Sequence, residues 1–130
     1  FCTPGVNIGL FCSTPMVALT RNLSRKRAME MLLLGDMLPA SEAAEYGLVN
    51  RVVAADKVMD EALALADRIA SKPPVTVATG KEAFYRQIEM PLAEAYDYAA
   101  GVMVANMMHA EAEEGIGAFI EKRPPDWDKS

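Results

Sequence analysis

The chain has 130 residues, 52% of them hydrophobic, and a formal net charge of −5. This length suits a single domain with its own core. The negative net charge gives no general attraction to nucleic acid or to an anionic membrane surface. With 2 cysteines and 1 histidine, the chain cannot supply the set of about four Cys or His ligands that a structural zinc site takes. The cysteine content also fits a reducing compartment better than a secreted disulfide framework.

The sequence predicts short helices and strands in the first part of the chain, residues 1–53. Alternating apolar residues over 1–11 predict an extended segment broken by glycines. Capping serines, an early proline and glycine stops then predict short helices, and a β-branched run predicts the best strand. The helices are expected over residues 13–22, 24–34 and 41–46, and the strand over 48–53.

The sequence predicts longer helices, separated by prolines, in the rest of the chain. Early acids and late bases predict an amphipathic helix that Asp56 caps and that Pro73 and Pro74 end. Pro91 separates the following helix from one over 92–108, and a last helix is expected over 113–122. The fold class is therefore expected to be mainly α with a few short strands.

The helix over residues 92–108 is apolar on most of its faces. The uncharged run from Tyr98 to Ala110 is shorter than the roughly 18 residues that a membrane span needs. A helix that is apolar all round is buried all round. Two readings stay open, a central core helix in a monomer and an interface with another subunit, and we favour the interface.

Several short strings resemble the crotonase superfamily, the enoyl-CoA hydratase/isomerase group. Each string alone is common, but their order and spacing run from one end of the chain to the other. They are Phe1-Cys2-Thr3-Pro4, Ala28-Met29-Glu30-Met31-Leu32 before Gly35-Asp36, Ala40-Ser41-Glu42-Ala43 with Gly47-Leu48-Val49-Asn50, and Glu114-Gly115-Ile116 before Ala118-Phe119-Ile120-Glu121-Lys122-Arg123-Pro124.

The resemblance implies the C-terminal portion of an α/β crotonase (ClpP/crotonase-like) fold. Residues 1–53 would end the α/β core with a pocket-lining segment, and residues 54–130 would form a helical region for trimerisation and CoA contact. Because the chain opens on Phe1 and not Met, we expect a piece of a longer protein. In the family, the oxyanion hole, a pair of backbone N–H groups that stabilises the enolate of a CoA thioester, and the first catalytic glutamate lie upstream.

The resemblance also implies the partners. We expect an acyl-CoA substrate and no cofactor beyond the coenzyme A of that substrate. We expect a homotrimer or a dimer of trimers, with no nucleic acid, no metal and no membrane span. The expected location is the cytoplasm, or the mitochondrial matrix in a eukaryote.

A glycine stands where the family's hydratases carry their second glutamate. That glutamate directly follows the proline of the Phe-x-x-Pro string, which is Pro4 here, and this chain has Gly5. Some isomerases of the family place a glutamate at what corresponds to Ser13. Adding water to an enoyl thioester needs a carboxylate to deprotonate the water, and the first carboxylate in the chain is Glu30. We therefore assign no catalytic residue, and expect Pro4 and Gly5 to line the substrate site.

Phe119 and Lys122 resemble an aromatic and a lysine that reach the CoA moiety in the family. A lysine offers a compact positive charge to a phosphate. The alternative for Lys122 is a solvated lysine that the helix dipole favours. The basic run of residues 25–27 has a similar pair of readings, an anion site or, as we favour, a solvated surface cluster.

Cys2 and Cys12 flank the expected site. An activated thiolate there would be a nucleophile, although core packing is the more common role of a cysteine and the one we favour. His109 follows two methionines at a helix end, and we expect it to be structural.

Three hypotheses for the function remain. The first is an enoyl-CoA hydratase/isomerase family protein that binds or converts acyl-CoA thioesters through oxyanion-hole stabilisation of an enolate. The second is a non-catalytic relative that serves assembly or regulation. The third is another CoA reaction on the same oxyanion hole, such as thioester hydrolysis or decarboxylation.

Overall fold

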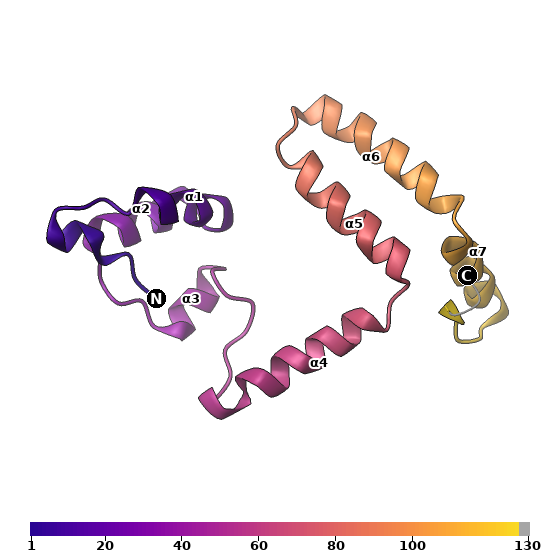
Figure 1. The fold of residues 1–130 in the computed structure, drawn as a ribbon, viewed down its shortest axis with the longest axis horizontal. Helices are drawn as coiled ribbons and strands as arrows, with labels where there is room; N and C mark the ends of the chain where they lie inside the picture. Colours follow the sequence, from indigo (N-terminus) through magenta and orange to yellow (C-terminus); the bar gives the residue numbers. More distant parts are fainter. Residues whose placement is uncertain (128–130) are drawn as a thin grey trace. The chain divides into compact units, whose positions relative to one another are not determined.

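A computed structural model describes residues 1–127 of the chain. The chain divides into two compact units between Val58 and Met59. The elements are η1 (Pro4–Ile8), α1 (Ser13–Asn22), α2 (Arg25–Leu34), α3 (Ala40–Glu45), η2 (Ala55–Lys57), α4 (Val58–Ala70), α5 (Pro74–Gln87), α6 (Leu92–Met107) and α7 (Ala110–Glu121), as Figure 1 shows.

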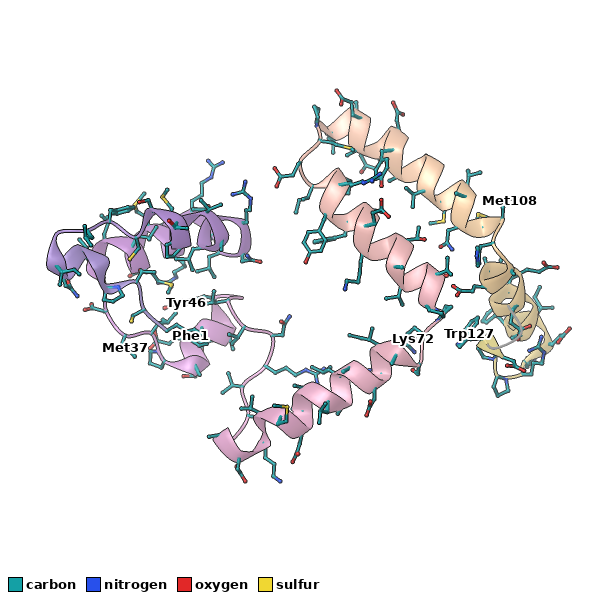
Figure 2. All side chains as sticks on the ribbon, in the orientation of Figure 1. Phe1, Met37, Tyr46, Lys72, Met108 and Trp127 are labelled. Carbon is teal, nitrogen blue, oxygen red and sulfur yellow. The ribbon has the colours of Figure 1, made fainter. Side chains whose placement is uncertain are left out.

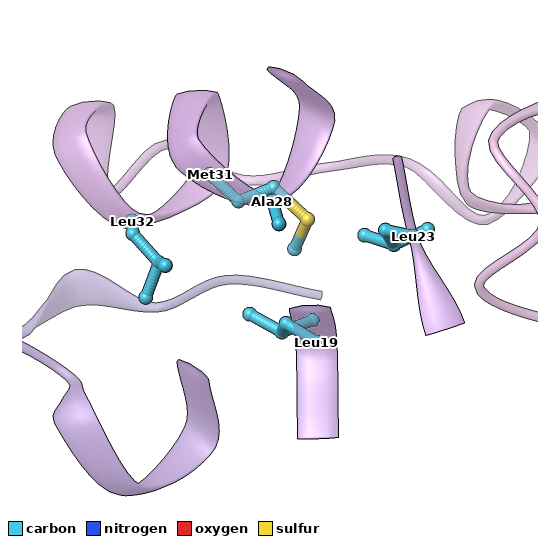
Figure 3. Packing of buried hydrophobic residues seen from close by; sticks show 5 residues of the cluster. All are labelled: Leu19, Leu23, Ala28, Met31 and Leu32. Atoms are coloured by element: carbon cyan, nitrogen blue, oxygen red, sulfur yellow. The ribbon is translucent and has the colours of Figure 1, made fainter. Parts of the chain in front are cut away.

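The first unit is built around a small core between α1 and α2. The core residues are 9% exposed or less, and Leu32 is the largest fully buried side chain. Half-buried residues from the start of α1 and from the segment around α3 pack against this cluster, Cys12 and Tyr46 among them. Figure 3 shows the core side chains, which are Leu19, Leu23, Ala28, Met31 and Leu32.

The contact between η1 and α2 depends on Thr3 and Gly35. The buried Thr3 hydroxyl donates to the Met31 carbonyl at 2.7 Å. Gly35 ends α2 with a left-handed φ of 66°, a conformation that glycine adopts without strain. A Cβ on Gly35 would lie 3.0 Å from Asn7 Nδ2. The predicted end of the helix at Gly35 is confirmed. Because Gly35 has no side chain, η1 can also lie close to the end of α2.

The expectation of short strands is wrong for residues 1–127, which are 71% helical and contain no strand. A strand needs a second extended segment to take its N–H and C=O groups. The N–H groups of Leu48 and Val49 instead both bond the Ala43 carbonyl, at 2.8 and 3.3 Å, and so close the end of α3. The alternation in residues 1–11 also misleads, because Pro4–Ile8 is the 3₁₀ helix η1.

The second unit contains helices α4 to α7. Consecutive helices α5 and α6 pack side by side, joined by a short turn before Pro91, and both contact α7 (Figure 1). The last helix begins earlier than the sequence predicts. His109 caps it, with Nδ1 accepting the Glu111 N–H at 3.2 Å. The structural role expected for His109 is therefore N-capping, although histidine is not among the preferred N-cap residues.

Helix α6 is not a core helix of this unit. Within the described chain Ala95 is its buried residue, while Tyr96 is 72% exposed and Val104 63% exposed. Met108, labelled in Figure 2 just after α6, is 83% exposed. Apolar side chains of this size are usually covered when they cluster. Among residues 1–127, no helix combines the length and apolarity needed to cross a bilayer.

Candidate functional site

The expected substrate-lining residues Pro4 and Gly5 begin η1. Proline suits this place because its fixed φ and missing N–H match the first turn of a helix. Gly9 ends η1 with a left-handed φ of 78°, and the chain then turns back. The Leu10 N–H donates to the Gly5 carbonyl at 2.9 Å. Residues 5–10 therefore form a closed loop at the start of the first unit.

Gly5 lies against two atoms from the returning chain. A Cβ built on Gly5 would lie 2.7 Å from the Leu10 carbonyl oxygen and 2.8 Å from Cys12 Sγ. Cys12 is half-buried and unpaired, and Cys2 is exposed and unpaired. The structure therefore places Cys12 directly against Gly5. The sequence predicted that both cysteines flank the site, but it did not predict this contact.

Ser13 is the first residue of α1 and is exposed. Its hydroxyl donates to the Phe11 carbonyl at 3.2 Å. A serine hydroxyl has no charge and a poor basicity, so it cannot act alone as the base that deprotonates water. Neither family position, Gly5 nor Ser13, presents a carboxylate.

The basic run at the start of α2 is partly used within the fold. The Arg27 guanidinium pairs with Glu30 at 2.8 Å and lies 4.0 Å from the centre of the Tyr46 ring. The hydrogen bond with Glu30 raises the pKa of Arg27 above its ordinary value, while burial raises the pKa of Tyr46. Arg25 and Lys26 stay exposed. One of the three cations therefore serves to join α2 to the end of α3.

A small hollow of about 140 Å³ lies between α2 and the segment that leads into α3. Four of its lining residues are apolar, three are acidic and one is a tyrosine, and the residues at the expected site, Gly5 and Ser13, do not contribute to it. Within residues 1–127 no set of three or more His, Cys, Asp or Glu is placed to hold a metal ion. The hollow is lined by Glu30, Met31, Leu34, Asp36, Met37, Leu38, Glu42 and Tyr46.

Phe119 and Lys122 lie at the end of α7, in the second unit. Phe119 is 84% exposed, a large aromatic surface left without cover in the described chain. Lys122 caps the helix with a left-handed φ of 56°, unusual for a residue other than glycine. Its side chain is exposed. Both side chains are therefore exposed within residues 1–127, and their contact with CoA stays a prediction.

An ion-pair cluster that no sequence pattern indicated holds the segment after α7 against that helix. Arg123 binds both carboxylate oxygens of Glu114, at 2.5 and 3.0 Å, and its Nε donates to Glu121 at 2.6 Å. The Asp126 N–H donates to the same Glu114 carboxylate at 2.8 Å. These carboxylates raise the pKa of Arg123 above its ordinary value. No local spacing rule pairs residues nine positions apart, so only the resemblance marked Glu114 and Arg123.

No sequence pattern indicated the buried carboxylate of Glu111 either, which is 3% exposed. Glu111 accepts the N–H groups of Val75 and Thr76 at 2.9 and 2.7 Å, and the Thr76 hydroxyl at 2.9 Å. Burial alone would raise the pKa of this carboxyl, but the hydrogen bonds outweigh it and the pKa lies below its ordinary value. Glu111 thus caps α5 from α7 and is structural.

All of residues 1–130 match the family model described as enoyl-CoA hydratase/isomerase. The chain belongs to the enoyl-CoA hydratase/isomerase family. The resemblance to crotonases read from the short strings is thereby confirmed.

Individual relatives agree with the family. Enoyl-CoA hydratase domain-containing protein 3, mitochondrial, from Rattus norvegicus is 48% identical over 98% of this chain and 42% of its own length. A crystal structure of an enoyl-CoA hydratase from Mycobacterium smegmatis is 51% identical, with a TM-score of 0.94 over 98% of this chain and 50% of that one. The crystal structure of human enoyl-CoA hydratase domain-containing protein 3 is 45% identical, with a TM-score of 0.90 over 98% of this chain and 50% of that one. The chain thus spans about half the length of these relatives.

Proposed function

We propose that this chain is the C-terminal half of an acyl-CoA-binding member of the family that does not hydrate enoyl-CoA through the usual pair of glutamates. In this proposal the substrate is an acyl-CoA thioester, and an oxyanion hole outside residues 1–130 stabilises its enolate. Pro4 and Gly5 line the acyl end of the site. The substrate's own coenzyme A is the only cofactor proposed.

The observation that carries the proposal is the absence of an acid at both family positions. Gly5 and Ser13 stand there, and the nearest carboxylate along the chain, Glu30, is paired with Arg27. A general base contributes about 10²- to 10⁴-fold to a reaction of this kind. Thioester binding and enolate stabilisation depend on other groups, so they survive this loss.

We further propose that Phe119 and Lys122 bind the CoA moiety. Phe119 supplies an exposed ring against which a planar group can stack. Lys122 supplies a positive charge, held at the end of α7 by the cap geometry. In this proposal residues 1–53 hold the acyl group, and residues 54–130 hold CoA and the subunit contacts.

A trimer, or a dimer of trimers, is the proposed assembly. The exposed apolar side chains of α6, Met103, Val104 and Met107 among them, support it, because an uncovered surface of this kind is costly in water. The relatives named above include mitochondrial proteins. The proposed location is the mitochondrial matrix in a eukaryote and the cytoplasm otherwise.

A non-catalytic relative with an assembly or regulatory role is the second candidate, and the same missing acids favour it. Another CoA reaction, such as thioester hydrolysis, is a third candidate, which needs an activated water from elsewhere in the protein. Carnitinyl-CoA dehydratase from Proteus mirabilis, 37% identical to this chain, illustrates that relatives bear names for different reactions on CoA thioesters.

Calorimetry and an absorbance assay on the full-length protein test the proposal. Butyryl-CoA, which carries no double bond to hydrate, should bind more tightly than free CoA. Crotonyl-CoA should be hydrated at least about 100-fold more slowly than by a family hydratase that carries both glutamates, measured in the same assay, because about 100-fold is the smallest effect of losing a general base. Failure of butyryl-CoA, crotonyl-CoA and CoA to bind would contradict acyl-CoA handling. Hydration at the rate of that two-glutamate hydratase would contradict the loss of hydratase chemistry.

A further inference from the structure

We propose that position 5 is closed to every side chain, so that this protein cannot regain the hydratase carboxylate by a single substitution. The wall of the site at that place is then made by the Leu10 carbonyl and the Cys12 thiol. The inference rests on the proposed function, in which position 5 is the place of the family's second hydratase glutamate. It goes further by limiting the substrates to acyl-CoA thioesters whose conversion needs no carboxylate there.

The first obstacle is backbone. The Leu10 oxygen lies 2.7 Å from the place of a Cβ on Gly5, well inside ordinary carbon–oxygen contact. The Leu10 N–H bonds the carbonyl of Gly5 itself at 2.9 Å, so the two residues are held together by their own hydrogen bond. Moving Leu10 as a whole away from Gly5 would break that bond. A side chain at position 5 would therefore collide with the Leu10 carbonyl and destabilise the loop of residues 5–10.

The second obstacle is the side chain of Cys12. Cys12 Sγ lies 2.8 Å from the same Cβ place. Cys12 packs against the core cluster of the first unit, and its carbonyl accepts the Met16 N–H at 3.0 Å in the first turn of α1. Neighbouring core side chains limit how far the thiol can move toward the cluster. The thiol thus fills the space that the first carbon of a glutamate would need.

Gly5 and Cys12 are therefore expected to be energetically coupled. Removing Sγ relieves one of the two close contacts and leaves the Leu10 contact in place. Gly5→Ala should consequently be less harmful in a Cys12→Ala background than in the parent, although still harmful. Two residues in direct contact show this non-additivity, whereas distant residues do not.

The test is a set of variants of the full-length protein, with Gly80→Ala as the matched control. Gly80 lies in α5, and a Cβ there meets no atom within 4 Å. Melting temperatures should fall for Gly5→Ala, stay level or rise for Gly80→Ala, and show partial relief in Gly5→Ala with Cys12→Ala. Gly5→Glu, alone or with Cys12→Ala, should give no gain in crotonyl-CoA hydration over the parent.

Three results would overturn the inference. They are an unchanged melting temperature for Gly5→Ala, strict additivity with Cys12→Ala, and a gain of hydration in Gly5→Glu. If Gly5→Ala does not fold while Gly80→Ala does, recovery of folding in the double variant supports the closure and its absence refutes the role of Cys12. The melting temperatures involve no ligand. They therefore test the closure of position 5 independently of butyryl-CoA binding, which tests the proposed function.

Discussion

The carboxylate of Glu111, at the start of α7, accepts both the N–H and the hydroxyl of Thr76, at the start of α5. Residues 35 positions apart in the chain are joined by these bonds. Asn106, at the end of α6, donates to the same Thr76 hydroxyl at 3.3 Å. One threonine therefore links the ends of three helices, and the second unit has few other buried side chains to hold them.

Replacing this carboxylate should loosen the second unit. In Glu111→Gln one acceptor oxygen becomes an NH₂ group that faces N–H donors of α5, and the favourable charge at that helix N-terminus is lost. We expect the melting temperature, followed by circular dichroism, to fall by several degrees. Glu113→Gln is the matched control, because Glu113 is an exposed acid in the same first turn of α7. Equal melting temperatures for the two variants would show that Glu111 does not join the helices.

The same carboxylate should make part of the stability depend on pH. The pKa of Glu111 in the fold lies below its ordinary value, which is about 4.3 for an unfolded glutamate. Its contribution is therefore complete above the unfolded pKa, and is lost as the pH falls through the folded pKa. The gap in melting temperature between the parent and Glu111→Gln should narrow as the pH is lowered below about 4. A gap that widens on acidification would refute the assignment.

Gly35 should tolerate alanine less well than Gly9 does. Both have a left-handed φ, 66° and 78°, but a Cβ on Gly35 meets Asn7 and Val6 whereas a Cβ on Gly9 meets nothing within 4 Å. The left-handed conformation alone costs an alanine about 1–2 kcal/mol. Gly35→Ala should lose this amount and more of the free energy of unfolding in denaturant titrations, and Gly9→Ala about this amount alone. Equal losses would mean that η1 is not packed on Gly35.

Lys122 should contribute to CoA affinity through its charge. Lys122→Gln removes the charge and should weaken butyryl-CoA binding by up to about fivefold, the size of an exposed ion pair. The effect should shrink at high salt, because exposed charges are screened. Lys81→Gln, on exposed α5 surface, should change the affinity little. If the two variants bind alike, Lys122 is the solvated lysine of the alternative reading.

The helices were largely predictable because their boundaries depend on local residues. The stop at Gly35 and the start at Leu92 follow from glycine and proline signals that act within one turn. The helix Ser13–Asn22 has the predicted bounds, but the expected serine cap is wrong, because Cys12 is the N-cap and no side chain caps the helix. The segment after α3 was not predictable in this way. Its β-branched composition favours a strand, but a strand needs a partner from elsewhere, and residues 1–127 supply none.

The candidate site was predictable only as a set of residue types. The family strings placed Gly5 at the glutamate position, yet no sequence pattern indicates that Leu10 and Cys12 close around it. That contact arises from the turn at Gly9, whose geometry carries the chain back over Gly5. The capping role of Glu111 was likewise invisible, because its partners in α5 lie far away in sequence.

Titration calorimetry of crotonyl-CoA into the full-length protein tests the central claim most directly, because one trace reports both binding and turnover. The account predicts a saturable binding heat with no sustained heat of hydration after each injection. A family hydratase that carries both glutamates, measured alongside, provides the reference for turnover. The absence of any binding heat would contradict acyl-CoA handling. A sustained heat equal to that of the reference hydratase would contradict the loss of hydratase activity that the account links to Gly5.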